Sequence, residues 1–140
     1  MIQQGACTVF KTNLLAGNED FAAGSPYTYK IALYTANANL GPETLAYTSN
    51  GEISGTGYTA TGKNLTVIPV VTGNSTTAYI SFDNVTWDPA SFTARGALIY
   101  NGTTGAAVCV LDFGSDKTAT NIFTVTFPAA TSTAAIIRLS

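Results

Sequence analysis

The sequence predicts an all-β fold, an antiparallel β-sandwich or jelly roll of about eight short strands. Runs of β-branched and aromatic residues recur through the chain, and turn residues separate them at intervals of about ten positions. No segment of helical length lies between two of these runs, as a parallel sheet would require. At 140 residues the chain is predicted to form one domain, 1–140, which can bury a core without disulfides or a metal.

The N-terminal segment, residues 1–26, contains the stretch with helical periodicity. Apolar residues recur at helical spacing within ACTVFKTNLLAG, namely Cys7, Phe10, Leu14 and Leu15. Gly17 is typical of the position just after the end of a helix. We expect a short helix here, with a first strand as the competing assignment, and segment 1–26 is also a candidate arm for contact with a partner.

The strands are predicted from runs of alternating or β-branched residues. They cover residues 27–35, 64–71, 77–87, 92–101, 106–113, 121–127 and 134–140. In the second run, Pro69 cannot donate a hydrogen bond to a neighbouring strand, which predicts an edge strand or a bulge. Asn101 and Gly102 predict a hairpin between the fourth and fifth runs. Gly114 is expected to end the fifth run in a turn.

The stretch GTGYTATGKN, residues 55–64, is close to two nucleotide-binding motifs by its letters. A P-loop has Ser or Thr after its lysine, whereas Asn64 stands there in this chain. A phosphate site also needs a helix N-terminus, and the β-branched run LTVIPVV that follows is a poor helix former. We therefore expect a sharply turning surface loop in which Tyr58 packs inward as an anchor.

The distribution of charge argues against several classes of partner. Only 10% of the residues are charged, the net charge is −2, and the six Lys and Arg residues are scattered along the chain. Nucleic acids and anionic membranes are recognised by clustered cations, so neither is expected as a direct partner. A surface with so little charge is covered either by small polar residues or by another protein.

The sequence offers no recognisable catalytic or metal-binding constellation. It contains no histidine, which removes His-dependent catalysis and most zinc sites. A paired-carboxylate hydrolase and a calcium site beside Asp83 stay formally open, but no spacing supports either one. Cys7 and Cys109 fit no metal or redox spacing, and Cys109 is expected to be a buried, inert thiol. We predict no enzymatic activity, no cofactor and no metal.

The chain is also expected to be soluble and to be made in the cytoplasm. Its N-terminus, MIQQGACTVFK, lacks the basic start and apolar core of a signal peptide. No apolar run approaches the ~20 residues that a membrane-spanning helix requires.

Five blocks of sequence, in a fixed order, carry a resemblance to a known family. They are KIALYTANANLGPETLAYTSNGEISGTGYTATGK, VTWDPASFTARGALIYN, VLDFGSDK, FTVTFPAA and AIIRL, and the likeness extends over residues 9–139. The chain resembles small virion structural proteins of tailed bacteriophages, in particular the jelly-roll capsid cement (decoration) proteins of short-tailed phages. The resemblance implies a homodimer on the virion surface that sits across boundaries between major capsid protein subunits and reinforces the shell. It also implies synthesis in the host bacterial cytoplasm and no catalytic residues.

Four aromatic residues are the interface candidates: Phe10 and Phe21 in the N-terminal segment, Tyr58 in the glycine-rich loop, and Trp87 at a strand end. The alternative function is a phage tail or host-surface-binding (carbohydrate-binding) β-sandwich module. That alternative predicts exposed aromatic residues, such as Trp87 with Tyr47 or Tyr58, on one concave face. For Trp87 a cap over the core is the commoner interpretation, with the sugar platform or protein contact as the alternative.

Overall fold

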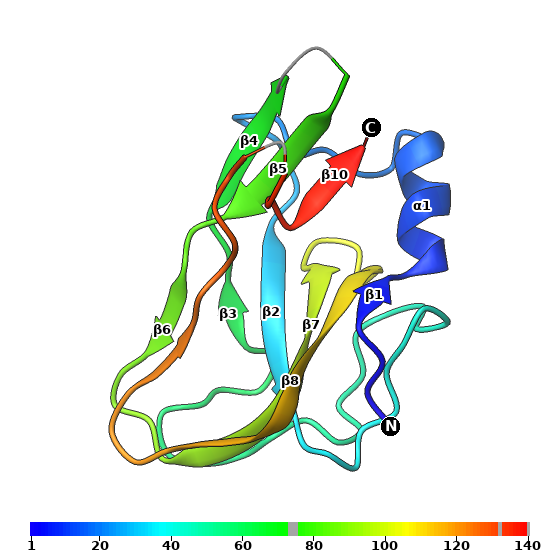
Figure 1. Cartoon of the computed structure of the whole chain (residues 1–140). Coiled ribbons are helices and arrows are strands. Elements are labelled where there is room, and N and C mark those ends of the chain that lie inside the picture. The colour runs from blue at the N-terminus through cyan, green and yellow to red at the C-terminus, as the bar shows by residue number, and fades with distance from the viewer. Residues whose placement is uncertain (73–75, 132, 140) are drawn as a thin grey trace.

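The computed structural model describes residues 1–72, 76–131 and 133–139. The chain is mostly β-structure, its named strands pair antiparallel, and one short helix, α1 (Thr8–Leu15), lies near the N-terminus (Figure 1). The predicted all-β class and the predicted N-terminal helix are both confirmed.

The strands form three sheets within the described residues. The first has the order β1 (Gly5–Ala6), β8 (Ala107–Ala119), β7 (Phe92–Asn101), β2 (Tyr29–Tyr34) and β3 (Lys63–Asn64). The second has the order β10 (Ile137–Leu139), β5 (Ala78–Phe82) and β4 (Val67–Thr72). The third pairs β6 (Val85–Trp87) with β9 (Phe123–Val125). The sheet of β10, β5 and β4 lies at the same end of the molecule as α1 (Figure 1).

The helix ends at the residue that the sequence predicts. Gly17 has a φ of 76°, and Asn18 donates a backbone hydrogen bond of 2.8 Å to the carbonyl oxygen of Asn13, an arrangement of the Schellman type. Phe10 is buried and joins the helix to the core, whereas Leu15 is 91% exposed. The helix therefore presents an apolar side chain to solvent at its C-terminal end.

Two strand boundaries follow from particular residues. β4 contains Pro69 and is one of the two edge strands of its sheet. Its register with β5 shifts between Ile68 and Val71, so the prediction of an edge strand or a bulge is confirmed. The predicted strand 77–87 is instead two strands, β5 and β6. Asn84 lies between these two strands, and its side-chain oxygen accepts a hydrogen bond of 2.9 Å from the backbone N–H of Phe127. Phe127 lies beyond the end of β9, so this bond gives its N–H group a partner outside the strand pairing.

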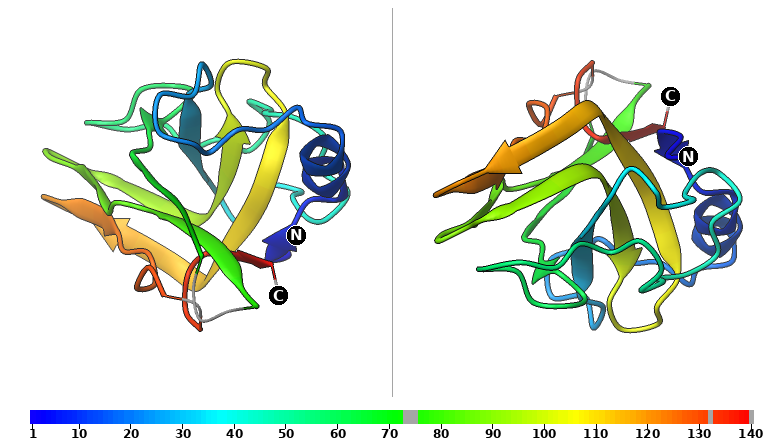
Figure 2. Two further views of the ribbon diagram at one scale, coloured as in Figure 1. Left: turned by 90° about the horizontal axis from the view of Figure 1, so that it is seen from above. Right: turned by 90° about the horizontal axis from the view of Figure 1, so that it is seen from below.

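The long strand β8 differs from its prediction. The sequence predicts a turn at Gly114, but the strand continues past this residue, which takes a φ of 83° within it. The pairing of β7 with β8 shifts at this point, because Ala94 lies opposite Lys117 and Gly96 lies opposite Asp112. An irregularity of this kind bends a strand pair, and Figure 2 shows both long strands curving.

The hairpin between β7 and β8 is confirmed. Its loop begins at Asn101 and Gly102, and the Asn101 side-chain oxygen accepts hydrogen bonds from the backbone N–H groups of Thr103 and Thr104 at 2.9 and 3.1 Å. The side chain of Asn101 therefore holds the turn in place, which is a common role for Asn in tight turns.

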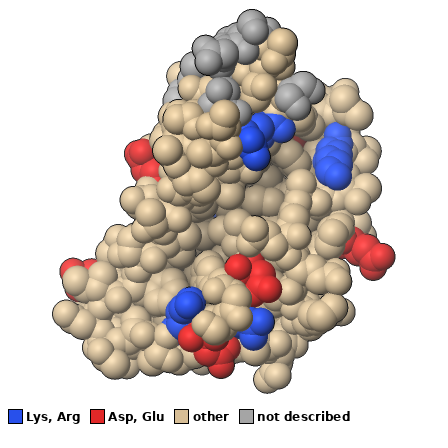
Figure 3. Space-filling model, viewed as in Figure 1, with Lys and Arg blue, Asp and Glu red and all other residues tan. Residues whose placement is uncertain are grey.

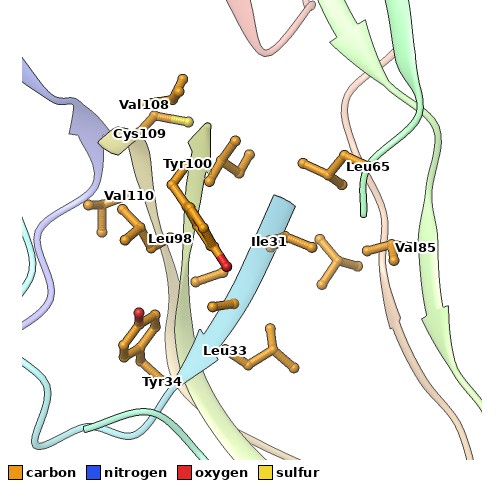
Figure 4. Close-up of a cluster of buried hydrophobic side chains, with 14 of the residues drawn as sticks. Ile31, Leu33, Tyr34, Leu65, Val85, Leu98, Tyr100, Val108, Cys109 and Val110 are labelled. Atoms are coloured by element: carbon orange, nitrogen blue, oxygen red, sulfur yellow. The ribbon is translucent and has the colours of Figure 1, made fainter. Parts of the chain in front are cut away.

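The five-stranded sheet is covered on both of its faces. Ile31 and Leu33 of β2 point toward the side where Val85 of β6 lies, and Tyr34 points to the opposite side (Figure 4). All four side chains are buried. The Tyr34 hydroxyl donates a hydrogen bond of 2.6 Å to the carbonyl oxygen of Thr48, so the long segment between β2 and β3 covers this second face.

Candidate functional site

One carboxylate holds the segment between β2 and β3 in place. Glu52 accepts hydrogen bonds at Oε1 from the Tyr58 hydroxyl at 2.6 Å and from the Thr61 backbone N–H at 2.8 Å, and at Oε2 from the Tyr47 hydroxyl at 2.5 Å. The Tyr58 hydroxyl also accepts a hydrogen bond of 3.0 Å from the backbone N–H of Leu33 in β2. Glu52 therefore ties three parts of this segment to one another and, through Tyr58, to the sheet.

The tyrosines of this network are hydrogen-bond donors at neutral pH. Burial is the main cause that raises the pKa of Tyr47 and of Tyr58, and the neighbouring Glu52 carboxylate raises the pKa of each hydroxyl further. A phenol in such surroundings stays protonated and serves neither as a general base nor as a nucleophile at pH 7. The network accordingly has a structural role.

Two glycines of the loop permit close approaches of the backbone. Gly57 and Gly62 have φ values of 87° and 80°. A Cβ on Gly57 would collide with the carbonyl oxygen of Pro89, and a Cβ on Gly62 would collide with that of Ile31. Strand β3 follows the loop, so no helix N-terminus is present for a phosphate. The expected turning loop with Tyr58 as its inward anchor is confirmed.

Tyr58 also belongs to an aromatic cluster centred on Trp87. The ring of Trp87 stacks on Tyr58 with 6.2 Å between centroids, and it meets Phe92 and Phe123 edge-on at 6.4 and 6.0 Å. The ammonium nitrogen of Lys63 lies 5.6 Å from the centre of the Trp87 ring. Trp87 is 1% exposed, so it caps the core and has no open face on which a sugar ring could stack.

The predicted interface aromatics lie largely inside the chain. Phe10, Phe21 and Trp87 are buried, and Tyr58 is half-buried. The ring of Phe21 stacks on Tyr29 with 4.4 Å between centroids and meets Phe10 edge-on at 6.0 Å. Burial places these rings mainly in the core, so most contacts of a partner must come from other residues; the ring of Phe10 still forms part of the wall of a surface groove.

A second carboxylate is buried at the other end of the sheet. Glu19 accepts a hydrogen bond of 2.8 Å at Oε1 from the side-chain amide of Asn101, but its Oε2 atom has no hydrogen-bond partner among the described residues. Burial raises the pKa of Glu19 despite the opposing effect of the hydrogen bond from Asn101. The ionised form of Glu19 is therefore costly inside the folded chain.

The remaining metal-ligating and nucleophilic groups form no assembled site in the described residues. No group of three or more His, Cys, Asp or Glu side chains there is arranged to hold a metal ion. Cys7 and Cys109 are free and buried, and burial raises their pKa values to about 11 and about 12. Thiols with such pKa values are poor nucleophiles at neutral pH. The predicted burial of Cys109 is confirmed. Among the helical residues described, no stretch is both long and apolar enough to cross a bilayer.

An apolar groove of about 710 Å³ lies between α1 and β10, with β1 and β8 contributing to its walls. The side chains that matter for its chemistry are Lys11, Leu14 and Leu15 from α1 and Ile137, Arg138 and Leu139 from β10. Leu15 is 91% exposed and Leu139 is 58% exposed. Figure 3 shows a basic side chain over α1 and another beside β10. We call this feature the α1–β10 groove.

Sequence reasoning did not single out this groove. The alternation of Ile137, Arg138 and Leu139 is visible in AIIRLS and indicates a strand with one apolar and one polar face. That this strand faces α1 across an open groove depends on contacts between opposite ends of the chain, and no local pattern reports them.

Comparison of the chain with protein-family models, with curated proteins and with solved structures finds no match.

Replacement of Gly62 by alanine tests the close backbone approach in the loop. Gly62→Ala is expected to destabilise the chain more than Gly105→Ala. Gly105 has a similar φ of 83°, but a Cβ there meets nothing within 4 Å. The positive φ alone costs about 1–2 kcal/mol for alanine, and the collision with Ile31 adds about 1–3 kcal/mol. Urea unfolding of both variants measures the difference, and equal losses would show that the collision is relieved.

Replacement of Glu52 by glutamine tests the carboxylate network. Glu52→Gln keeps one acceptor oxygen but leaves one tyrosine hydroxyl without an acceptor. We expect a loss of about 2–3 kcal/mol in the free energy of unfolding. The control Glu43→Gln, at an exposed position, should change stability by less than about 0.5 kcal/mol. A double-mutant cycle with Tyr58→Phe should show coupling of about 1 kcal/mol, and additive losses would contradict the network.

The raised pKa of Glu19 predicts a pH dependence of stability. A carboxyl with a higher pKa in the folded chain binds more protons there, so stability rises as the pH falls through the folded-state pKa toward the ordinary value of 4.5. The cost of the buried charge is fully present at pH values above the folded-state pKa. Glu19→Gln removes the cost of burying this charge. The variant should therefore exceed the natural chain in free energy of unfolding by the largest amount at pH 7, and this difference should shrink toward pH 4. Urea unfolding across this range measures it, and parallel pH profiles would contradict the assignment.

Proposed function

We propose that this chain is a bacteriophage capsid cement (decoration) protein that binds the outer surface of the major capsid protein shell and stabilises it, as a homodimer. The observation that carries the proposal is the resemblance of five ordered blocks, over residues 9–139, to small virion structural proteins. A protein of this kind acts by noncovalent contact over its surface and needs no catalytic group.

The roles of the ionisable side chains support this proposal. Glu52 and Glu19 accept hydrogen bonds within the fold, and Asp112 accepts from Arg95 Nε at 3.2 Å. The thiols are buried and protonated. The ionisable groups with defined contacts therefore hold the chain together, and the little-charged surface in Figure 3 suits broad contact with another protein.

The energetic basis of a cement role is preferential binding to the assembled shell. A protein that binds the shell but not its dissociated subunits stabilises the shell by about 2.7 kcal/mol per site when its free concentration is about 100 times the Kd. Many equivalent sites on a symmetric shell make the total large. A two-fold symmetric dimer would match two-fold positions of such a shell.

Shells prepared with and without this protein test the proposal. We expect shells that lack it to release packaged DNA at a temperature several degrees lower, and adding back the purified chain to restore the higher temperature. An unrelated all-β protein of similar size and charge serves as the control. Reconstruction of the particle should place the chain on the outer head surface. Equal heat resistance with and without the chain, or a location on the tail, would contradict the cement role.

A further inference from the structure

We propose that the α1–β10 groove binds an extended segment of a partner polypeptide in which apolar residues alternate with Asp or Glu, and that this segment adds to β10 as a further strand. That the segment belongs to a capsid subunit rests on the function proposed above. The kind of segment that the groove fits is argued from the residues of the groove alone.

The backbone of β10 has one open edge among the described residues. On one side Ile137, Arg138 and Leu139 pair antiparallel with β5, and the order β10, β5, β4 makes β10 the outer strand. An outer strand presents N–H and C=O groups that can pair with an added strand. The groove provides space for a chain beside this edge, because it separates β10 from α1.

The side chains of β10 define which residues the added strand should carry. Ile137 and Leu139 line a small apolar extension of the groove together with Phe10 and Leu14. Arg138, between them in sequence, is exposed and lies on the opposite face of the strand. Neighbouring residues of paired strands interact on the same face, so apolar residues fit beside Ile137 and Leu139, and an acidic residue fits beside Arg138.

The charge of the groove selects an acidic partner. Among the described residues, Lys11 and Arg138 are the charged residues that line it, and no described Asp or Glu does so. Arg138 donates one hydrogen bond of 2.9 Å from Nη1 to the carbonyl oxygen of Thr133, and its other N–H groups have no partner among the described residues. The described ion pair joins Arg95 to Asp112 and does not involve the groove. A protein of net charge −2 thus presents a positive groove with apolar walls.

The same charges disfavour a second copy of this chain as the occupant. A two-fold interface brings the same patch of both copies together. Two copies of Lys11 and two of Arg138 would then face one another, and like charges that meet in an interface weaken it. A lipid surface supplies negative charge but no strand that could pair with β10, so the concave, open-edged groove favours a polypeptide.

A synthetic peptide tests the groove directly. The probe is a capped, fluorescein-labelled peptide of alternating valine and glutamate, and the control probe alternates valine and lysine. By fluorescence anisotropy we expect the acidic peptide to bind at least about tenfold more tightly than the basic one. Its binding should weaken in about 0.5 M NaCl, because salt screens exposed charge pairs.

Two charge-reversal variants locate the binding. Arg138→Glu should weaken binding of the acidic peptide at least about tenfold. Lys117→Glu makes the same change in net charge at an exposed residue of β8 that does not line the groove, and it should bind as the natural chain does. Leu139→Ser, which alters an exposed apolar side chain, should also weaken binding. Circular dichroism and thermal unfolding check that each variant is folded.

Backbone methylation distinguishes strand addition from simple charge attraction. In an extended peptide the N–H groups of valines point to one edge and those of glutamates to the other. Methylation of all valine nitrogens in one peptide and all glutamate nitrogens in another therefore blocks opposite edges. We expect one of the two methylated peptides to lose binding and the other to keep it. Retention of binding by both would overturn the addition of a strand to β10.

The shell experiment separates this inference from the proposed function. Loss of both peptide binding and shell binding in Arg138→Glu would support the groove as the shell contact. Binding of the acidic peptide by a chain that does not bind shells would support the groove and overturn the capsid role. No binding of the acidic peptide, equal binding by Arg138→Glu, or binding to phosphatidylserine vesicles alone would overturn the groove proposal, whatever the shells show.

Discussion

The fold depends on the fixation of a long, strand-poor segment against one face of the five-stranded sheet. On the face that carries Tyr34, residues between β2 and β3 form part of the cover, as the hydrogen bond from the Tyr34 hydroxyl to the Thr48 carbonyl oxygen shows. Glu52 makes this possible because its two oxygens accept three hydrogen bonds from that segment. The segment also buries Leu40 and Ile53, and the hydrogen bonds to Glu52 add to this apolar burial in offsetting the conformational entropy lost when the segment is ordered. Glu52 therefore acts together with backbone hydrogen bonds, such as that from Ile53 N–H to the Leu33 carbonyl oxygen, to hold the segment on the sheet.

Tyr58 and Thr61, which both donate hydrogen bonds to Glu52, link the Glu52 network to the rest of the molecule. Tyr58 donates its hydroxyl to Glu52 and stacks its ring on Trp87, so the same side chain belongs to both systems. Thr61 has a φ of 80°, a strained conformation for a residue that is not glycine. Its N–H donates to Glu52, and its carbonyl oxygen accepts from the Tyr100 hydroxyl at 2.6 Å, which together hold that conformation. A strained backbone conformation of this kind persists when several contacts hold the residue in place, as they do for Thr61.

Sequence patterns predicted the features that local geometry controls. Pro69 has no backbone N–H to donate, and it lies on an edge strand as predicted. Gly17 takes the left-handed backbone conformation just after the end of the helix, as is common for glycine. Trp87 shows the limit, since exposure depends on which rings pack around it and not on its neighbours in sequence. Gly114 shows another limit, because a positive φ suits both a turn and an irregular strand pair. The α1–β10 groove joins segments from opposite ends of the chain, which no window of sequence contains.

The burial of the two cysteines has a practical consequence. Cys7 and Cys109 are the only cysteines of the chain, and both thiols are shielded from solvent and held in the unreactive protonated form. A cysteine introduced on the surface would therefore react with maleimides far faster than either native thiol. The natural chain is in this respect already a single-site labelling scaffold, on which dyes or cross-linkers can be attached at a chosen position without first removing its own cysteines.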